Sequence, residues 1–306
     1  MSLGTTTLQP LIVAVSSSAI FKQDFEDAIY KSDPAEYAKY QEENVDTPLE
    51  KGPAFSFVAR LLDLNESLGR QVVDVVVLSR NSALTGRRIF SSIQHYGLGI
   101  ERAIFTDGYA PHTFLSALGS HLYLSPNEPD VREALAMGNP AGLIVDNEHQ
   151  EHQKGRSLRV AFDFDGVISD DGSERVYAES GIEAFHQHET LKKDVPHDLG
   201  PLAALLSKLA EIREVEESFA LGNPDYTVAI KICIVTARSR DGFDRAVTTL
   251  KMLGVPVDFA AFLAGTSKEP ILDALRPIIF FDDQSRHLSA SSDKTSLIHI
   301  PFGVRN

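Results

Sequence analysis

The sequence predicts an α/β protein made of two pseudo-symmetric halves, each a three-layer (αβα) sandwich. Two features of the 306-residue chain predict it. Short apolar runs with strand character alternate with amphipathic, helix-like stretches along the whole chain, and segments of the first half recur in order in the second. Strands and helices in alternation indicate a mainly parallel sheet with helices on both faces.

The expected strands are short apolar runs separated by segments with the apolar spacing of helices. They lie at 11–15, 72–79, 103–105 and 122–125 in the first half, and at 158–164, 230–236, 260–264 and 277–283 in the second. Such units build Rossmann-like sheets, in which ligands bind outside the carboxyl ends of the strands. Catalytic and ligand-binding residues are therefore expected among those that end each strand.

The repeat is visible in residues that match between the halves. The pairs, in chain order, are Ser16 with Asp163, Ser18 with Asp165, Gly52 with Gly200, Ser79 with Thr236, Gly108 with Gly265, and Ser125 with Asp282. The separation is 147 or 148 residues for the first three pairs and 157 for the last three. A single insertion produces such a step, so we interpret the halves as a duplicated domain.

The substitutions within the repeat assign different roles to the two halves. Each of the three acids named above is matched by a serine, and Pro126 is matched with Asp283. A serine cannot supply the charge that holds a hard cation. We therefore expect residues 1–150 to be a degenerate copy kept for binding or architecture, and residues 151–306 to be the catalytic half. The boundary is expected in the polar stretch 146–155.

Charge and composition limit the kinds of molecule that the protein is expected to bind and the compartment in which it is expected. A formal net charge of −14 disfavours a nucleic-acid polymer, whose phosphate backbone attracts basic surfaces. It leaves small phosphorylated substrates open, because local donors and a metal can bind those. No apolar run reaches the roughly 18 residues that span a bilayer, and no signal peptide is recognisable. The single cysteine, Cys233, fits a reducing compartment, so we expect a cytoplasmic protein.

The sharpest chemical signal is Asp163-Phe164-Asp165-Gly166, which closes an apolar strand. Strand alternation points the two aspartates the same way. One carboxylate can attack phosphorus while the other transfers protons to the leaving group and from water. Gly166 allows a sharp turn that exposes its N–H to a phosphate. Taken alone, the motif also suits a polar strand end or a Ca²⁺ loop.

Three further strand ends of the second half carry groups that phosphoryl transfer requires. Thr236 would offer its hydroxyl to a phosphate oxygen, helped by the following backbone amides, beginning with Ala237. Lys268 would neutralise phosphate charge and hold the nucleophile in place. Asp282 and Asp283 suit a metal ligand and its neighbour. Each feature alone has an ordinary structural explanation, but their order along successive strand ends indicates a phosphotransferase.

The order of acid pair, threonine, lysine and acid pair resembles the four motifs of the haloacid dehalogenase (HAD) superfamily of phosphotransferases. More narrowly, the chain resembles the cytosolic 5′-nucleotidase I family over nearly its whole length. The similar segments are AVSSSAIF, EKGPAFSFV, RNSALTGRRIFSSIQHYGLGIER, LYLSP, DFDGVISDD, IVTARS, FLAGTSK and IFFDDQ. Phe164 and Gly166 replace the Gly and Ala of animal members. This change brings the motif closer to the general superfamily pattern and leaves substrate preference open.

The resemblance implies a reaction and the residues that perform it. The reaction is hydrolysis of a nucleoside 5′-monophosphate of the AMP, IMP or deoxynucleotide type to nucleoside and phosphate, through an aspartyl-phosphate. Asp163 would be the nucleophile and Asp165 the acid/base, while Thr236 and Lys268 would hold the phosphate.

The resemblance also implies a metal ion and a cap. Mg²⁺ would be held by Asp163, the backbone carbonyl of Asp165, and Asp282 or Asp283. The superfamily inserts a cap between its first two motifs, and residues 171–230 would form it here. Such a cap excludes water and selects the leaving group.

Three residues have an open role. Arg238 either touches the substrate or pairs with a neighbouring acid. Asn81 and Arg88 match the family in the first half and lie near either the nucleotide or an effector site; the alternative is a helix that docks the two halves.

Two other functions remain open at this stage. The substrate could be a sugar phosphate or another small phosphomonoester, or the chain could be a non-catalytic nucleotide sensor. A nucleotide effector and a homo-oligomer are further partners that the sequence leaves undecided.

Overall fold

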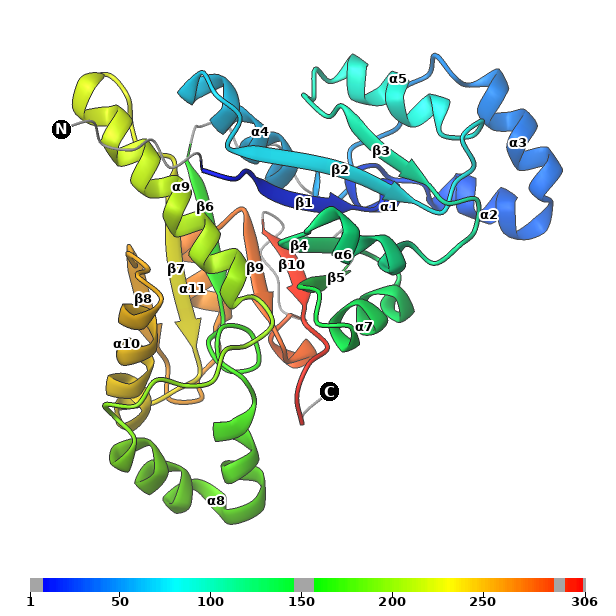
Figure 1. Cartoon of the computed structure of the whole chain (residues 1–306). Coiled ribbons are helices and arrows are strands. Elements are labelled where there is room, and N and C mark those ends of the chain that lie inside the picture. The colour runs from blue at the N-terminus through cyan, green and yellow to red at the C-terminus, as the bar shows by residue number, and fades with distance from the viewer. Residues whose placement is uncertain (1–7, 146–156, 289–294, 305–306) are drawn as a thin grey trace.

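The computed structural model describes residues 8–145, 157–288 and 295–304 (Figure 1). Its strands form one sheet in the order β3-β2-β1-β4-β5-β10-β9-β6-β7-β8. The strands are β1 (Leu11–Val15), β2 (Val73–Ser79), β3 (Arg102–Phe105), β4 (Leu122–Ser125), β5 (Ala141–Val145), β6 (Leu158–Phe162), β7 (Ile230–Thr236), β8 (Phe259–Phe262), β9 (Ile279–Asp282) and β10 (Ser296–His299). The α/β class predicted from the sequence is confirmed.

The strand order is symmetric about the β5–β10 contact. Strands β1 to β5 occur as 3-2-1-4-5, and β6 to β10 follow as the mirror of that order. Pairing is parallel within each half and antiparallel between β5 and β10, where Leu297 faces Val145. The two halves expected from the sequence therefore share a single sheet. The β5–β10 contact also pairs two strands that would otherwise be exposed edges.

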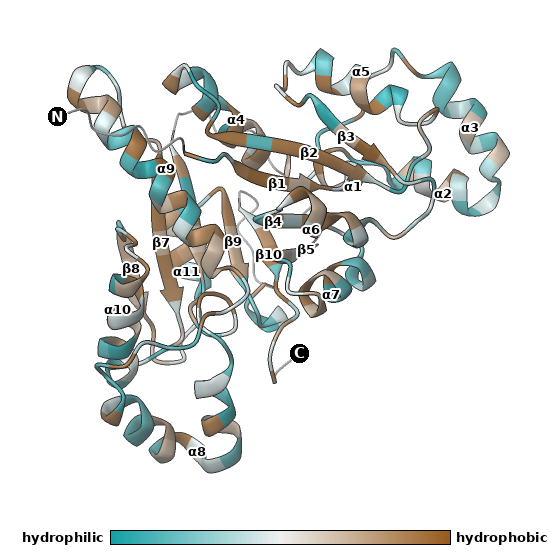
Figure 2. Cartoon of the chain, in the orientation of Figure 1, coloured by the Kyte–Doolittle hydropathy of each residue, from teal (hydrophilic) through white to brown (hydrophobic). Residues whose placement is uncertain are grey.

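Helices cover both faces of this sheet (Figures 1 and 2). The α-helices of the described residues are α1 (Ser17–Ile20), α2 (Asp24–Ser32), α3 (Pro34–Glu43), α4 (Phe55–Leu68), α5 (Arg87–His95), α6 (Leu115–Leu118), α7 (Glu128–Ala136), α8 (Gly172–Leu191), α9 (Ala203–Gly222), α10 (Phe243–Met252) and α11 (Glu269–Leu275). Figure 2 shows the apolar strands between helices whose outer faces are polar.

The core divides according to the face of the sheet. One large cluster joins both halves: it contains Val13 of β1 and Phe162 of β6 together with buried side chains of α4, α5, α9 and α10. On the opposite face, Ala14 packs with α7 in the first half, and Ala161 packs with α11 in the second. Because alternate strand residues point to opposite faces, each half forms three layers.

The halves also share local hydrogen bonds after their first strand. The Gly52 N–H donates to the Ile20 carbonyl at 2.7 Å, and the Gly200 N–H donates to the Ile168 carbonyl at 2.7 Å. These glycines are the matched pair of the sequence repeat, and each precedes the helix that follows, α4 or α9. The shared strand order and these bonds support the duplication; the boundary expected at 146–155 lies outside the described residues.

The expected cap segment, 171–230, has two structurally different parts. Helix α9 packs on the sheet, with Leu205, Leu209 and Ile212 in the shared core. Helix α8 instead lies beyond the carboxyl ends of β6 and β7, as α2 and α3 lie beyond those of β1 and β2 (Figure 1). In each half, therefore, a helical segment faces the strand ends.

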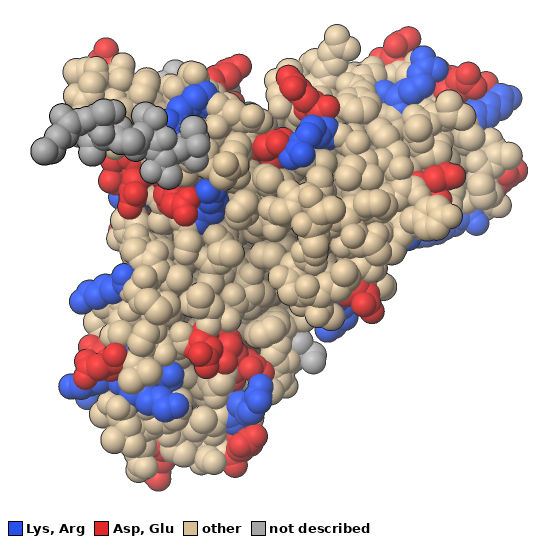
Figure 3. All heavy atoms as spheres, in the orientation of Figure 1, with Lys and Arg blue, Asp and Glu red and all other residues tan. Residues whose placement is uncertain are grey.

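On the face seen in Figure 3, acidic and basic side chains are interspersed. None of the described helices is long and apolar enough to cross a membrane. Cys233, on β7, is buried and forms no disulfide.

Candidate active site

The acids of the first motif lie at the centre of the second half. Strand β6 is paired on one side with β9 and on the other with β7, so that Phe162 is in register with Phe281 and Ile234. Asp163 directly follows β6, and its N–H donates to the Phe281 carbonyl at 2.8 Å. Asp282 and Thr236 end the two neighbouring strands. Three of the predicted strand ends thus meet at one edge of the sheet.

Lys268 links the first and last of these strand ends. Its Nζ lies 2.6 Å from Asp163 Oδ2 and 2.6 Å from Asp282 Oδ2, and all three side chains are buried. Although burial opposes the charged form, these two carboxylates raise the pKa of Lys268 above its usual value. Burial also opposes ionisation of Asp282, but Lys268 and His287 hold the pKa of Asp282 below its usual value. The ammonium and Asp282 therefore stay charged in a buried site.

Asp163 is less firmly ionised than Asp282. Burial, with the nearby charges of Asp282 and Asp165, raises the pKa of Asp163 to about 6, against the opposing effect of Lys268. One carboxylate oxygen accepts from the Phe164 N–H at 2.7 Å, and the other contacts Lys268. The side chain is thus fixed at both oxygens. Its carboxylate form is the one that can attack phosphorus.

Asp283 is buried with no hydrogen-bond partner for either carboxylate oxygen among the described residues. Burial and the charges of Asp163, Glu174 and Asp282 raise the pKa of Asp283 to about 10. Gly166 packs directly against it: a Cβ at Gly166 would lie 2.8 Å from the Asp283 carboxyl, and its φ is +67°. A larger residue would therefore displace this carboxylate.

The acids offer two places for a divalent cation. Asp163, Asp282 and His287 each present a ligand atom within 4.8 Å of the others. Lys268, however, lies between the first two, and Asp282 also accepts from the Gln284 N–H at 2.8 Å. Among the described residues, neither a basic side chain nor a hydrogen-bond donor pairs with Asp283, and an unpartnered buried carboxylate is costly. The donor set therefore fits a hard cation that has Asp283 among its ligands better than one at Asp282.

Arg238 forms the second charged cluster of the site. Its Nε and Nη2 bind the two oxygens of Asp165 at 2.7 and 2.6 Å, the bidentate geometry of a strong ion pair. Its Nη1 pairs with Glu189 of α8, and its guanidinium lies 4.9 Å from the ring centre of Phe164. Of the two roles left open for Arg238, pairing with a neighbouring acid is the one that its contacts display.

Glu189 is the fully buried centre of that cluster. It accepts from Arg245 at 2.9 Å and from Ser173 at 2.8 Å, and His197 Nε2 lies 3.2 Å away. Although burial opposes ionisation, His197 and Arg238 hold the pKa of Glu189 far below its usual value. These bonds attach α8 to the loop after β7 and to α10, which fixes α8 over the strand ends.

The remaining predicted residues divide between the halves. Thr236 is buried, and its hydroxyl accepts from the Arg238 N–H at 3.2 Å, with Ala237 between them. Asn81 lies in the first half, where it accepts from the Tyr37 hydroxyl. Arg88 also lies there, buried in an ion pair with Glu26 at 2.7 Å. The structure thus brings together Asp163, Asp165, Gly166, Thr236, Arg238, Lys268, Asp282 and Asp283, but not Asn81 or Arg88.

Sequence reasoning missed His287 and Glu189. His287 Nδ1 lies 3.1 Å from Asp282, and the only signal for it is its position five residues after that acid. Glu189 lies in a polar helix with other acids around it, so nothing in its local pattern distinguishes it. Their roles follow from tertiary packing.

Comparison with known proteins identifies the family of this chain. The family model described as 5′-nucleotidase matches residues 4–306. The human protein cytosolic 5′-nucleotidase 1B is 35% identical over 303 residues, which cover 96% of this chain and 49% of that protein. The chain thus spans about half the length of this relative. No solved structure is significantly similar to it. Because the family model covers nearly the whole chain, this protein belongs to the 5′-nucleotidase family.

Proposed function

We propose that this protein is a phosphomonoesterase that hydrolyses nucleoside 5′-monophosphates to nucleoside and inorganic phosphate. The observation that carries the proposal is the buried Asp163 carboxylate at the end of β6, 2.6 Å from the Lys268 ammonium and beside the unpartnered Asp283. Membership of the 5′-nucleotidase family supports the nucleotide as substrate. The name of the human relative contains the word cytosolic, and we propose the cytoplasm for this chain as well.

In the first step, a carboxylate oxygen of Asp163 attacks phosphorus and the bond from phosphorus to the 5′ oxygen breaks. The product is an aspartyl-phosphate, and the departing nucleoside oxygen takes a proton from Asp165. Lys268 and the Thr236 hydroxyl, with the Ala237 amide, neutralise or bind the phosphoryl oxygens as charge builds on them. Their places on either side of Asp163 support this role.

In the second step, water attacks phosphorus and gives its proton to Asp165, and the bond between phosphorus and Asp163 breaks. Phosphate leaves, and both carboxyl groups return to their starting forms. The bidentate pair with Arg238 fixes the position of the Asp165 carboxyl group that accepts this proton. We propose that the pair loosens when the substrate phosphate approaches Arg238, so that Asp165 can carry a proton in the first step.

We propose Mg²⁺ as the cation of the site, held by Asp163, the Asp165 backbone carbonyl and Asp283. A hard cation there would offset the phosphate charge and polarise the phosphoryl group. The unpartnered carboxylate of Asp283 is the support for this assignment.

The test is a panel of monophosphates with released phosphate measured, with and without Mg²⁺. The proposal expects release from nucleoside 5′-monophosphates, and its loss in EDTA. Preferential release from sugar phosphates would support the alternative substrate class. No release from any monophosphate in the presence of Mg²⁺ would support a nucleotide sensor and refute an enzyme.

A further inference from the structure

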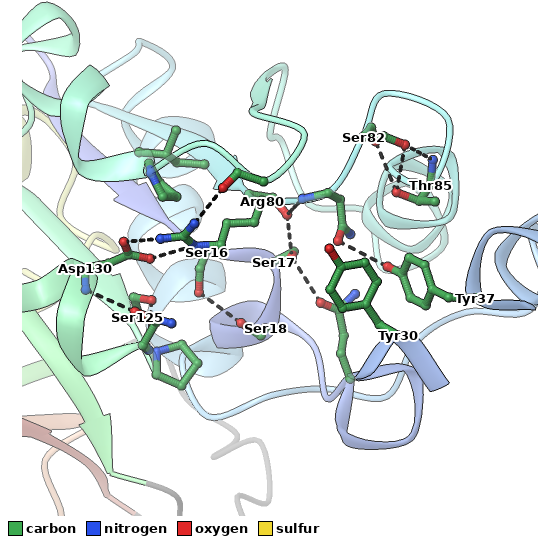
Figure 4. Close-up of a pocket in the computed structure, with 18 of the residues that line it drawn as sticks. Ser16, Ser17, Ser18, Tyr30, Tyr37, Arg80, Ser82, Thr85, Ser125 and Asp130 are labelled. Atoms are coloured by element: carbon green, nitrogen blue, oxygen red, sulfur yellow. Dashed lines mark hydrogen bonds and ion pairs between the residues drawn. The ribbon is translucent and has the colours of Figure 1, made fainter. Parts of the chain in front are cut away.

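The first half contains a cavity of about 940 Å³ (Figure 4). It lies at the carboxyl ends of β1, β2 and β4, which supply Ser16, Ser79 and Ser125 to its lining, and α2 and α3 supply Tyr30 and Tyr37. Small-molecule sites have volumes of about 300–1,000 Å³. The cavity is therefore large enough for a ligand of the size of a nucleotide.

This cavity occupies the place that the catalytic cluster occupies in the other half. Ser16, Ser79 and Ser125 are the repeat partners of Asp163, Thr236 and Asp282, and by the same separation Pro111 stands where Lys268 would be. Strand tips β1, β2 and β4 correspond to β6, β7 and β9 in the symmetric strand order. The backbone frame of the phosphate site is thus retained without its nucleophile, its lysine or its acids.

The lining contains buried hydrogen-bond donors for which the described residues offer no acceptor. Gln23 is 6% exposed; its Oε1 accepts from the Ser17 hydroxyl at 3.0 Å, and its Nε2 has no partner among the described residues. Asn81 is held in the same way: its Oδ1 accepts from Tyr37 at 3.1 Å, and its buried Nδ2 has no acceptor in the part of the chain that the structure describes. Buried donors without acceptors are uncommon in folded proteins. A ligand rich in acceptors would satisfy both.

The charges of the lining are compatible with an anion at the strand tips. Arg80 and Asp130 neutralise each other through a bidentate pair with distances of 2.6 and 3.1 Å. Lys22 and Lys31 are exposed and line the cavity, as do the exposed Asp24 and Asp107. Ser16 and Ser18 lie 3.3 Å apart at their hydroxyls, in the positions that carry carboxylates in the other half. Phosphate would meet hydroxyl and amide donors there and no acid at these two positions.

We propose that this cavity is a second binding site, which holds a phosphomonoester without cleaving it. The phosphoryl group would face the serines after β1 and the amide groups of Gln23 and Asn81. The rest of the ligand would lie under α2 and α3, where the rings of Tyr30 and Tyr37 are 5.3 Å apart between centroids. Hydrolysis is absent because a serine replaces the nucleophile. Binding at this site does not depend on the activity of the other half.

The first test uses hydrogen exchange on the full-length Asp163→Asn protein in EDTA, with AMP, ribose 5-phosphate and adenosine as probes. AMP is expected to slow exchange of amides in 16–24 and 79–86, in addition to any effect in 163–166. Slower exchange with ribose 5-phosphate would show that the phosphate and sugar are sufficient for binding. If ribose 5-phosphate has no effect and AMP does, binding also requires the base. Adenosine should have little effect. Slowing confined to the second half, or equal slowing by adenosine, would overturn the proposal.

The second test is a matched pair at Ser18, whose hydroxyl contacts Ser16 Oγ. Ser18→Asp places a negative charge where the phosphate is expected and should weaken AMP binding at this site about tenfold or more. Ser18→Asn, of similar size and neutral, should change binding by less than about threefold. An acid in the first turn of a helix favours the helix, so Ser18→Asp is expected to fold. Equal binding by both variants, with unchanged melting temperatures, would refute a phosphate at this position.

Discussion

The two halves place different side chains on the same backbone frame, and the difference sets the charge at the strand ends. In the second half, Asp163, Lys268 and Asp282 form contacts of 2.6 Å at the ends of strands β6 and β9. In the first half, serines end β2 and β4 and follow β1, and they line a cavity of about 940 Å³. Acids draw a counter-ion into the site, whereas hydroxyls do not.

The same comparison holds for the segments that face the strand ends. In the second half, α8 is attached through the buried Glu189 to Arg238 and Arg245. In the first half, α2 is attached through the buried Glu26 to Arg88 of α5. Each half therefore uses one buried acid to hold this segment. Only in the second half does the arginine also bind an acid of the first motif, Asp165.

The largest expected effect is at the nucleophile. Asp163→Asn should lower kcat for AMP at least about a thousandfold, because an amide oxygen cannot accept the phosphoryl group. The measurement is released phosphate at saturating substrate with Mg²⁺, and circular dichroism should show an unchanged fold.

Asp170→Asn is the matched control for this change. Asp170 lies in the same loop, where its carboxylate accepts from the Gly172 N–H at 3.2 Å, a bond that asparagine can keep. Its turnover should stay within about threefold of wild type. Comparable activity in the two variants would remove Asp163 from the mechanism.

The next prediction compares the stabilities of variants at the two buried acids, Glu189 of α8 and Glu26 of α2. Glu189→Gln should lower the free energy of unfolding by about 3–5 kcal/mol, because it leaves the buried Arg238 and Arg245 without their shared counter-ion. Glu26→Gln should cost less, about 1–3 kcal/mol, because Arg88 keeps its 2.8 Å bond to the Thr47 carbonyl. Urea denaturation of both variants measures this difference. An equal or larger loss of unfolding free energy in Glu26→Gln would contradict the role of Glu189 as a counter-ion shared by two arginines.

Much of the fold was predictable from local pattern. The apolar runs at 11–15 and 230–236 became β1 and β7 with the same bounds, because a strand buried on both faces needs only continuous apolar residues. Strands β5 and β10 were not predicted. They are short, and β10 belongs to the second half yet pairs with the first, so their role is set by a partner about 150 residues away.

The acids of the site were predictable from the sequence, but the residues that pair with them were not. Asp163, Lys268 and Asp282 each follow or end a strand, and parallel strands bring such ends together. Glu189 and His287 could not be found in this way, because a helix or loop residue reaches the site only through tertiary packing. The division of labour between Asp282 and Asp283 was also left open, since which of them contacts Lys268 depends on side-chain direction at the end of β9.

A smaller effect, on the pH dependence of stability in the metal-free protein, distinguishes Asp283 from Asp282. The raised pKa of Asp283 means that folding binds a proton between the unfolded pKa, about 3.9, and about 10. Wild-type stability in EDTA should therefore fall as pH rises through this window, relative to Asp283→Asn, by up to about 1.4 kcal/mol per pH unit. The increase in melting temperature that Mg²⁺ gives the wild type should be absent in the variant.

Asp282→Asn is the control, with the opposite sign. The pKa of Asp282 is lowered, so its carboxylate contributes stability above its unfolded pKa, and this contribution is lost as pH falls through the folded value. At pH 8 in EDTA, Asp282→Asn should be less stable than wild type and Asp283→Asn more stable. A loss of stability in both variants would mean that Asp283 has a favourable partner, and the cation assignment would fail.

The smallest effect concerns Ser16, the repeat partner of the nucleophile. Its side chain accepts from the Ala19 N–H at 3.2 Å and caps α1, whereas Asp163 accepts from the adjacent Phe164 N–H. Ser16→Ala should therefore lower the free energy of unfolding by about 1 kcal/mol, and Ser16→Asn, which retains a capping oxygen, by much less. Urea denaturation would separate these values. Equal losses of unfolding free energy in the two variants would contradict a capping role for Ser16. They would show that the volume of the side chain at this position matters instead.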